Sequence, residues 1–426
     1  MKVQTKKSGK QAAAQSAAKI DKASKTAHKW QFPTRIRPNA FGWKSSRLAV
    51  QRIKEALSEI NSVARHDPIH ASEGAIRLIE RLSPALEQVD SSSGALGSAV
   101  NGAIEALVPL IAAAPVTPKV RETWLERLFE AHEQDAMPYI ESLTDYWGDL
   151  CGSKELASAW ADRLLEITRL ALSPDKSLRG HYHGTTACLD SLLRAGRYAE
   201  LYEILKPEKF WSYKRWTVKA LAAEGKADEA IQFAESSRGH WTSDTDVNLL
   251  CEGILLSLGR TEEAYRRYGL YAHRAGTYLA TFRAVAKAYP SVPRAQILSD
   301  LIETTPGEEG KWFATAKELG LYDVALKLAR ESPCDPKTLA RAARDFADKE
   351  PAFAHGAGFA ALYWLTVGHG YEITSLDVWG AYYSTLKAAE HLGHSSETKA
   401  RIQQLVSQEA GGGFVRQVLG RELALA

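Results

Sequence analysis

Apolar residues recur at intervals of three to five positions along most of this chain from about residue 48 onward. In the segment LAVQRIKEALSEINSVA (residues 48–64), the residues on one helical stripe are Leu48, Ile53, Leu57, Ile60 and Val63. The segment GAIRLIERLSPALEQV (residues 74–89) repeats the pattern, and the sequence lacks the strict alternation and hairpin turns that are typical of strands. The pattern therefore predicts an all-α protein.

Four segments share one turn, in which a helix ends at a glycine and a second helix begins directly after it: residues 192–205, 220–234, 255–268 and 316–329. The glycines are Gly196, Gly225, Gly259 and Gly320, which suit the left-handed position that ends many helices. The fifth residue after each glycine is Leu201, Ala230, Ala264 or Ala325. Alanine at this position predicts a close helix–helix crossing. The wider gap after Gly259 predicts a further, divergent hairpin within residues 276–303.

A period near 34 residues with two helices per unit resembles the tetratricopeptide repeat, over roughly residues 185–335. The resemblance implies a right-handed α-solenoid of helical hairpins in the centre of the chain. The family usually has Trp in the first helix and a small residue four positions later. Here the corresponding pairs are Lys214 with Val218 and Asn248 with Glu252, so the peptide-binding specificity of the family does not carry over.

The predicted organisation has five parts: a disordered basic tail (1–29), an extended aromatic and basic segment (30–47), an N-terminal helical solenoid (48–180), tetratricopeptide-like hairpins (181–335) and a C-terminal helical region (336–426). Helices at the C-terminal end are expected over residues 335–348, 352–367, 375–392 and 395–409. The dipeptides Thr117-Pro118 and Asp335-Pro336 each predict a helix start, with an N-cap followed by proline at the first helical position.

Positive charge is concentrated at the N-terminus. Residues 1–47 hold 12 of the 54 Lys and Arg residues but only one of the 51 Asp and Glu residues, Asp21. The rest of the chain therefore carries 42 basic and 50 acidic residues. A basic arm on an acidic body attracts polyanions such as DNA or RNA, or folds back on its own surface. The candidates for polyanion binding are Lys6, Lys7, Lys10, Lys29, Arg35, Arg37 and Lys44.

No run of 18 apolar residues occurs, so the sequence predicts no membrane partner. The four cysteines lie far apart without a CxxC pair, which is typical of isolated core thiols in a reducing cytoplasm and not of disulfides or a zinc site. The sequence also lacks phosphate-loop, nucleophile-elbow and HExxH motifs, so we expect no cofactor.

In residues 30–47, four aromatic residues (Trp30, Phe32, Phe41 and Trp43) alternate with Arg35, Arg37 and Lys44. Pro33, Pro38 and Gly42 predict a non-helical backbone. Such a segment can stack on bases and contact phosphates, bind a partner protein, or cap the first helices of the protein itself. Because four exposed aromatic residues would form a costly apolar patch, we expect the segment to dock on the first helices.

Two further clusters are candidate sites. In KFWSYKRW (residues 209–216), the candidate partner-binding residues are Trp211, Tyr213, Arg215 and Trp216. Aromatic and arginine side chains often contribute most of the binding energy at interfaces. The alternative is that the two tryptophans pack between hairpins. In LRGHYHGTT (residues 178–186), His181 and His183 suggest an enzyme site, but no ligand set of the zinc type accompanies them, and the alternative is a helix start capped by Thr185 or Thr186. The sequence thus favours a non-enzymatic scaffold that binds another protein, with a nucleic-acid-binding subunit as the alternative.

Overall fold

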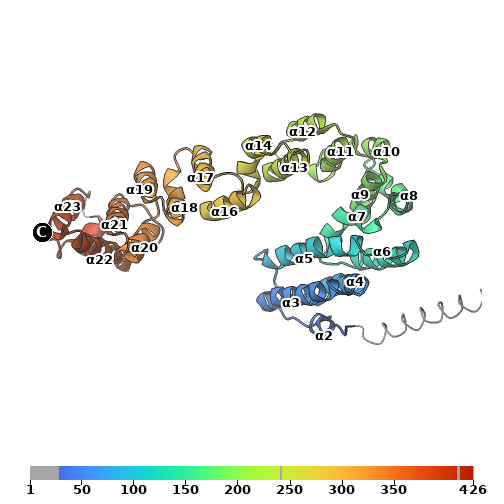
Figure 1. Cartoon of the computed structure of the whole chain (residues 1–426), viewed down its shortest axis with the longest axis horizontal. Coiled ribbons are helices and arrows are strands. Elements are labelled where there is room, and N and C mark those ends of the chain that lie inside the picture. The colour runs from blue at the N-terminus through green and yellow to red at the C-terminus, as the bar shows by residue number, and fades with distance from the viewer. Residues whose placement is uncertain (1–27, 240–241, 410–412, 426) are drawn as a thin grey trace, which may run out of the picture. The chain divides into compact units, whose positions relative to one another are not determined.

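The computed structural model describes residues 28–239, 242–409 and 413–425, and every regular element within these ranges is helical. Consecutive helices pack side by side as hairpins (Figure 1), which confirms the all-α prediction. The predicted tail, residues 1–29, lies outside the described ranges except for His28 and Lys29. The chain divides into two compact units, of which unit 1 ends at Ser237 and unit 2 begins at Arg238.

Unit 1 contains α2 (Phe32–Arg35), α3 (Ser46–Ala64), α4 (Pro68–Leu86), α5 (Ala95–Ala112), α6 (Pro118–Glu133), the 3-10 helix η2 (Glu141–Tyr146), α7 (Trp147–Cys151), α8 (Lys154–Ala171), α9 (Thr185–Ala195), α10 (Tyr198–Leu205), α11 (Trp211–Ala223) and α12 (Ala227–Ser236). Helix α3 packs against α4 and α5, α8 against α9, and α11 against α12. One hydrophobic core runs from Trp30 to Ala220, so residues 30–47 belong to the same folded body as the helices that follow.

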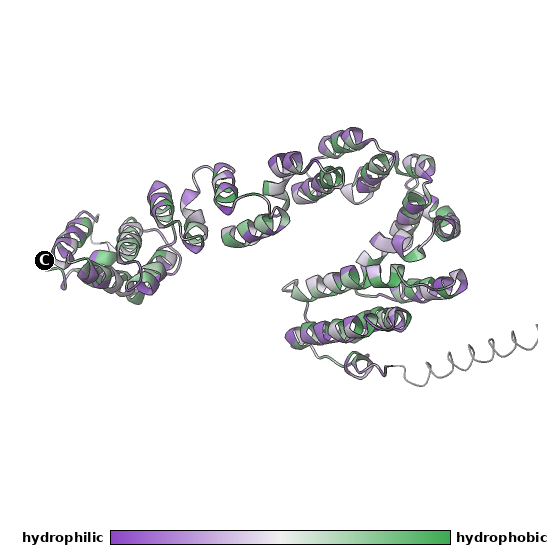
Figure 2. Cartoon of the chain, in the orientation of Figure 1, coloured by the Kyte–Doolittle hydropathy of each residue, from purple (hydrophilic) through white to green (hydrophobic). Residues whose placement is uncertain are grey.

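Unit 2 contains α13 (Asp244–Ser257), α14 (Thr261–Ala264), the π-helical turn η3 (Tyr265–Gly269), α15 (Leu270–Ala272), α16 (Tyr278–Ala288), α17 (Arg294–Glu303), the 3-10 helix η4 (Glu309–Trp312), α18 (Phe313–Glu318), α19 (Tyr322–Glu331), α20 (Pro336–Phe346), α21 (Pro351–Thr366), α22 (Ser375–His391), α23 (Ser395–Ser407) and α24 (Phe414–Leu419). A second core runs from Tyr265 to Leu423. Apolar and polar residues alternate around most helices of both units (Figure 2), as the three-to-five spacing predicts.

The shared glycine turn is confirmed. Gly196, Gly225, Gly259 and Gly320 all have φ between 72° and 81°, a region that other residues rarely adopt. The residues five positions later are fully buried: Leu201, Ala230, Ala264 and Ala325. Helices α16 and α17 form the predicted divergent hairpin. Thr117 and Asp335 cap α6 and α20 through their side chains, also as predicted.

Two local expectations are wrong. Residues 30–47 include one helical turn, α2, because Pro33 stands in its first turn, where proline costs no hydrogen bond. The buried line of α3 is made by Ala49, Ile53, Ala56 and Ile60, while Leu48 is exposed. Alanines let α3 approach its neighbours closely, so the true stripe is rotated from the one that the larger residues mark.

Helix α5 is, by length and composition, apolar enough to cross a membrane, and it is the one such helix among the described residues. It packs against α3, α4 and α7, and its buried residues include Leu96, Ile104 and Ile111. The four cysteine thiols, Cys151, Cys188, Cys251 and Cys334, are buried, as predicted. Burial raises the pKa of Cys151 and Cys334 to about 12 and that of Cys188 to about 11, so these thiols stay protonated at neutral pH.

Candidate interaction surfaces

The segment 30–47 lies against α3 and α4. Trp30, Phe32 and Phe41 are buried, together with Ile36. The Trp30 ring stacks on His70 of α4 at 5.0 Å, and it occupies the space that a side chain at Gly74 would fill, since a Cβ there would lie 2.3 Å from the ring. The segment therefore caps the first helices through a specific fit between Trp30 and Gly74.

Polar contacts hold the start of this segment. Glu59 of α3 accepts hydrogen bonds from the backbone N–H groups of Gln31 (2.7 Å) and Phe32 (3.1 Å), and His28 Nε2 lies 2.8 Å from Glu59 Oε1. Arg81 of α4 donates to the carbonyl oxygens of Pro33 and Ile36 at 3.3 Å each. One carboxylate thus satisfies two backbone donors that the short helix α2 leaves without intrahelical partners.

The expected burial of Trp43 is wrong, because its side chain is 66% exposed. Only its backbone is held, with the carbonyl oxygen accepting from the Asp90 N–H at 3.0 Å. The other candidate residues for polyanion binding differ in their surroundings. Arg35 pairs with Glu55 at 3.1 Å, while Lys29, Arg37 and Lys44 are exposed and form no ion pair with any described residue. Lys6, Lys7 and Lys10 lie outside the described residues.

The cluster on α11 is mostly internal. Trp211 and Trp216 are buried, so they do not form an exposed hot spot, and their burial agrees with the alternative of packing between hairpins. Tyr213 and Arg215 are partly exposed. Arg215 makes a two-pronged ion pair with Asp145 of η2, with Nη2–Oδ1 and Nη1–Oδ2 distances of 2.6 and 3.2 Å. The arginine is therefore committed to a partner within unit 1.

Beside this ion pair lies a buried carboxyl that the sequence does not reveal. Asp190 of α9 accepts a hydrogen bond from the Gly148 N–H at 2.6 Å, and burial raises its pKa to about 7. Lys219 of α11 lies 3.9 Å over the Trp216 ring, and burial lowers the pKa of its amine. The groups join α7, α9 and α11 and are not aimed at solvent, so we interpret them as a structural network.

The two histidines of residues 178–186 are exposed and lie before α9, with their ring centroids 4.7 Å apart. A third, buried histidine, His132 of α6, places Nε2 3.0 Å from the His183 carbonyl oxygen, and burial lowers the pKa of the His132 ring. Across the described residues, no group of three His, Cys, Asp or Glu side chains is placed to hold a metal ion. The expected cap by Thr185 or Thr186 is wrong in detail. Gly184 is the N-cap of α9, and no side chain makes a capping hydrogen bond there.

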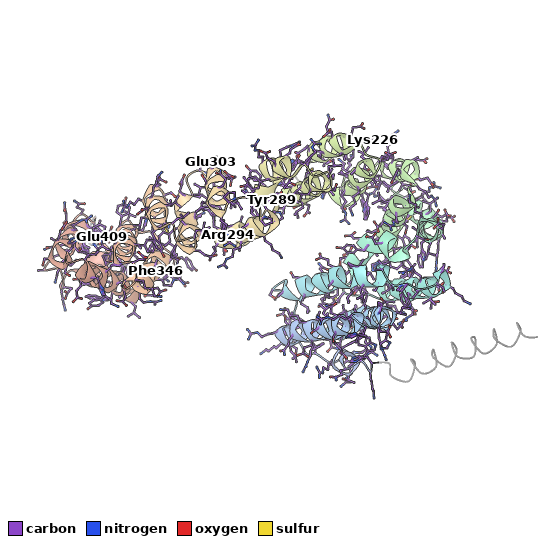
Figure 3. All side chains as sticks on the ribbon, in the orientation of Figure 1. Lys226, Tyr289, Arg294, Glu303, Phe346 and Glu409 are labelled. Carbon is purple, nitrogen blue, oxygen red and sulfur yellow. The ribbon has the colours of Figure 1, made fainter. Side chains whose placement is uncertain are left out.

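In unit 2, a buried carboxylate links neighbouring helices. Glu252 is buried on α13, accepts a hydrogen bond from the Tyr289 hydroxyl and lies 2.9 Å from His273 Nε2. Tyr289 is the C-cap of α16 (Figure 3) and also lies against Gly269, at the end of η3. The carboxylate thus joins two neighbouring hairpins through hydrogen bonds in place of close packing.

An exposed aromatic surface on α22 is a functional candidate that sequence reasoning missed. Leu376 is 81% and Tyr383 60% exposed, and the Trp379 and Tyr383 rings stack with centroids 5.3 Å apart. We call these three residues the α22 face. Leu376 and Tyr383 point away from the buried line that includes Val378, Ala381 and Tyr382, while Trp379 is partly buried and packs against the core. A hollow of about 620 Å³ adjoins the face at Tyr383 and continues between α22 and α23, lined by Lys387, Ser395 and Lys399 among others.

Together, these features define an all-helical protein built from packed helical hairpins, with a capped N-terminal end and an exposed aromatic face on α22. No protein-family model matches the sequence, and no curated protein matches it at a significant level.

Proposed function

We propose that this chain is a non-enzymatic interaction scaffold, a right-handed α-solenoid with tetratricopeptide-like hairpins in its centre, which binds another protein through the α22 face. The single observation that carries the proposal is the exposure of Leu376 and Tyr383 beside the stacked Trp379 ring. Large apolar side chains clustered at a surface are typical of a binding site, and Trp and Tyr are enriched among residues that dominate binding energy.

The surroundings of the α22 face suit a protein partner. On either side of the face, Lys337 of α20 donates to the Glu372 carbonyl oxygen at 2.8 Å, and Lys387 of α22 pairs with Asp348 of the α20–α21 connection at 2.8 Å. A rigid apolar centre with a charged rim is the usual anatomy of a protein interface. The loop before α22 adds Tyr371, which is 80% exposed.

The test compares two double variants of the full chain, each of which replaces two exposed apolar side chains with serine. Leu376→Ser with Tyr383→Ser disrupts the α22 face, and Tyr363→Ser with Val367→Ser alters exposed residues of α21 and its C-cap. Quantitative co-purification from the native host should show one stoichiometric partner that the first variant loses at least ten-fold and the second retains. A partner retained equally by both variants, or no partner with wild type, would contradict the proposal.

A second candidate function, a nucleic-acid-binding subunit that uses residues 1–47, is favoured by one specific observation. Lys44 and the neighbouring Arg47 are exposed, and each lacks an ion-pair partner among the described residues. Basic side chains that are not neutralised within the protein remain available to phosphate groups.

A further inference from the structure

A small surface at the start of α3 combines an exposed aromatic ring with three basic side chains. It consists of Trp43, Lys44, Arg47 and Lys54, which we call the Trp43 patch, and all four residues are exposed. Arg47 and Lys54 are seven residues apart on α3, which places them on the same side of the helix. From Arg47 to Lys54 the helix rises about 10 Å. Trp43 and Lys44 directly precede the N-cap, Ser45, so the ring and the cations share one end of unit 1.

The patch is positively charged because the nearby carboxylates are already engaged. No Asp or Glu occurs from residue 22 to residue 54. The first carboxylate of α3, Glu55, pairs with Arg35 at 3.1 Å and Arg52 at 2.6 Å, and Glu59 binds the start of the segment. Among the described residues, none forms an ion pair with Lys44, Arg47 or Lys54.

The α4–α5 connection holds two carboxylates, Glu87 and Asp90, and the backbone of Asp90 contacts that of Trp43. Asp90 Oδ1 accepts a hydrogen bond from the Ser92 N–H at 3.0 Å, which lowers the pKa of the carboxyl, while the Asp90 N–H donates to the Trp43 carbonyl oxygen. The same short connection therefore fixes the Trp43 backbone. Lys44, Arg47 and Lys54 bring three positive charges that no ion pair among the described residues neutralises, which leaves the patch positive.

The exposure of Trp43 contrasts with its own segment, where the other three aromatic side chains are buried. Its backbone is anchored between the buried Phe41 and the start of α3, and the Ser45 N–H donates to the Gly42 carbonyl oxygen at 2.9 Å. An exposed aromatic ring on an anchored backbone, with basic residues close by in the chain, is the arrangement that single-strand-binding proteins use, since a base stacks on the ring while Lys and Arg contact phosphates.

We propose that the Trp43 patch binds single-stranded nucleic acid, with a base stacked on Trp43 and with Lys44, Arg47 and Lys54 on the phosphates. The inference rests on the second candidate function and makes it specific, and it is independent of the α22 face. Recognition is not sequence-specific, because every base offers a π-face. The eight lysines of residues 1–29 add charge that does not distinguish sequences.

The test uses the full chain and a fluorescein-labelled 20-nucleotide oligo(dT), with affinity read by anisotropy. Trp43→Ala should weaken binding roughly 5- to 100-fold, since stacking on one aromatic ring contributes about that much per base. Trp43→Phe should restore most of the loss, because it keeps an aromatic face. The matched control is Tyr371→Ala, which removes another highly exposed ring in unit 2 and should leave oligo(dT) affinity unchanged. Lys44→Gln with Arg47→Gln should make the slope of log K against log salt shallower by roughly 1.4, from about 0.7 per phosphate contact.

Heparin, duplex DNA and poly-glutamate separate the possible explanations. The Trp43→Ala loss should be confined to oligo(dT), because heparin and poly-glutamate offer no bases and duplex bases are already stacked. Equal loss for heparin, or tighter binding of poly-glutamate than of oligo(dT), overturns the inference and indicates a general polyanion site or an acidic protein partner. Wild-type affinity in Trp43→Ala also overturns it while leaving the second candidate function standing, whereas no binding of oligo(dT) by the wild-type chain refutes both.

Discussion

The fit between Trp30 and Gly74 predicts that Gly74→Ala destabilises the wild-type protein but stabilises a variant that lacks the Trp30 ring. In the wild-type chain, Gly74→Ala places a methyl group where the Trp30 ring lies, 2.3 Å from its nearest atom, so the ring must move. Overpacking of this kind costs about 1–3 kcal/mol. Once Trp30→Ala has removed the ring, the same Gly74→Ala change should stabilise the protein by about 0.5–1 kcal/mol, because alanine is favoured over glycine inside a helix.

The Trp30→Ala change itself should be severe. The ring is 9% exposed and touches His70 and Phe32, so it buries about 200 Å² of mostly apolar surface, worth about 5 kcal/mol at about 25 cal/mol per Å². Large-to-small changes of this size cost about 3–5 kcal/mol. Trp43→Ala, in the same segment but exposed, is the matched control and should cost less than about 0.5 kcal/mol.

Trypsin cleavage after Arg35 reports this fit directly, because the rate tracks the fraction of molecules in which the segment has left α3 and α4; the bond after Arg37 is not a trypsin site, since Pro38 follows it. Trp30→Ala should raise the rate at least ten-fold, and Gly74→Ala should raise it in the wild type but not in the Trp30→Ala background. Urea unfolding followed by circular dichroism gives the free energies, read on the transition of unit 1, since a chain of two units need not unfold in one step. If Gly74→Ala costs the same with and without Trp30, the proposed fit is wrong.

Two further predictions concern the helix crossings and the buried carboxyl. Replacing the fully buried Ala230 or Ala264 with Leu should cost about 1–3 kcal/mol of stability by overpacking. The control, Ala223→Leu on the exposed side of α11, should cost little. Unchanged melting temperatures for both buried variants would contradict close helix–helix crossings at these alanines. Burial raises the pKa of Asp190 to about 7, so the folded state keeps a proton that the unfolded chain releases near pH 4. The free energy of unfolding of unit 1 should therefore fall as the pH rises from about 4 to 7, by at most about 4 kcal/mol. Asp190→Asn should flatten that part of the pH profile in urea unfolding, and a profile identical to the wild type would refute the assignment.

The sequence predicts the hairpins well because their signal is local. A glycine after a helix and a small residue five positions later depend on backbone conformation and on one crossing, so Gly225 and Ala230 are recognisable without knowledge of the rest of the fold. The same holds for Thr117 and Asp335, whose side chains cap the helices that begin directly after them.

The surfaces are harder to predict because they depend on residues that are distant in the chain. Nothing near Trp43 distinguishes it from Trp30; the difference lies in Gly74, which offers space to one ring but not to the other. The α22 face was missed for a similar reason. Leu376 and Tyr383 have a spacing typical of a buried stripe, and only the packing of α20 and α21 on the opposite side of α22 shows that they are left uncovered.

The buried cysteines have an experimental consequence. Each thiol should be unreactive toward an alkylating or disulfide reagent until its own surroundings open. Cys151 and Cys188 belong to unit 1, and Cys251 and Cys334 belong to unit 2. The four native thiols are therefore probes of local opening. If one unit opens without the other, its two thiols will react at a common rate while the two thiols of the other unit stay unreacted. The rates of thiol labelling therefore measure how cooperatively each unit opens, without any introduced cysteine.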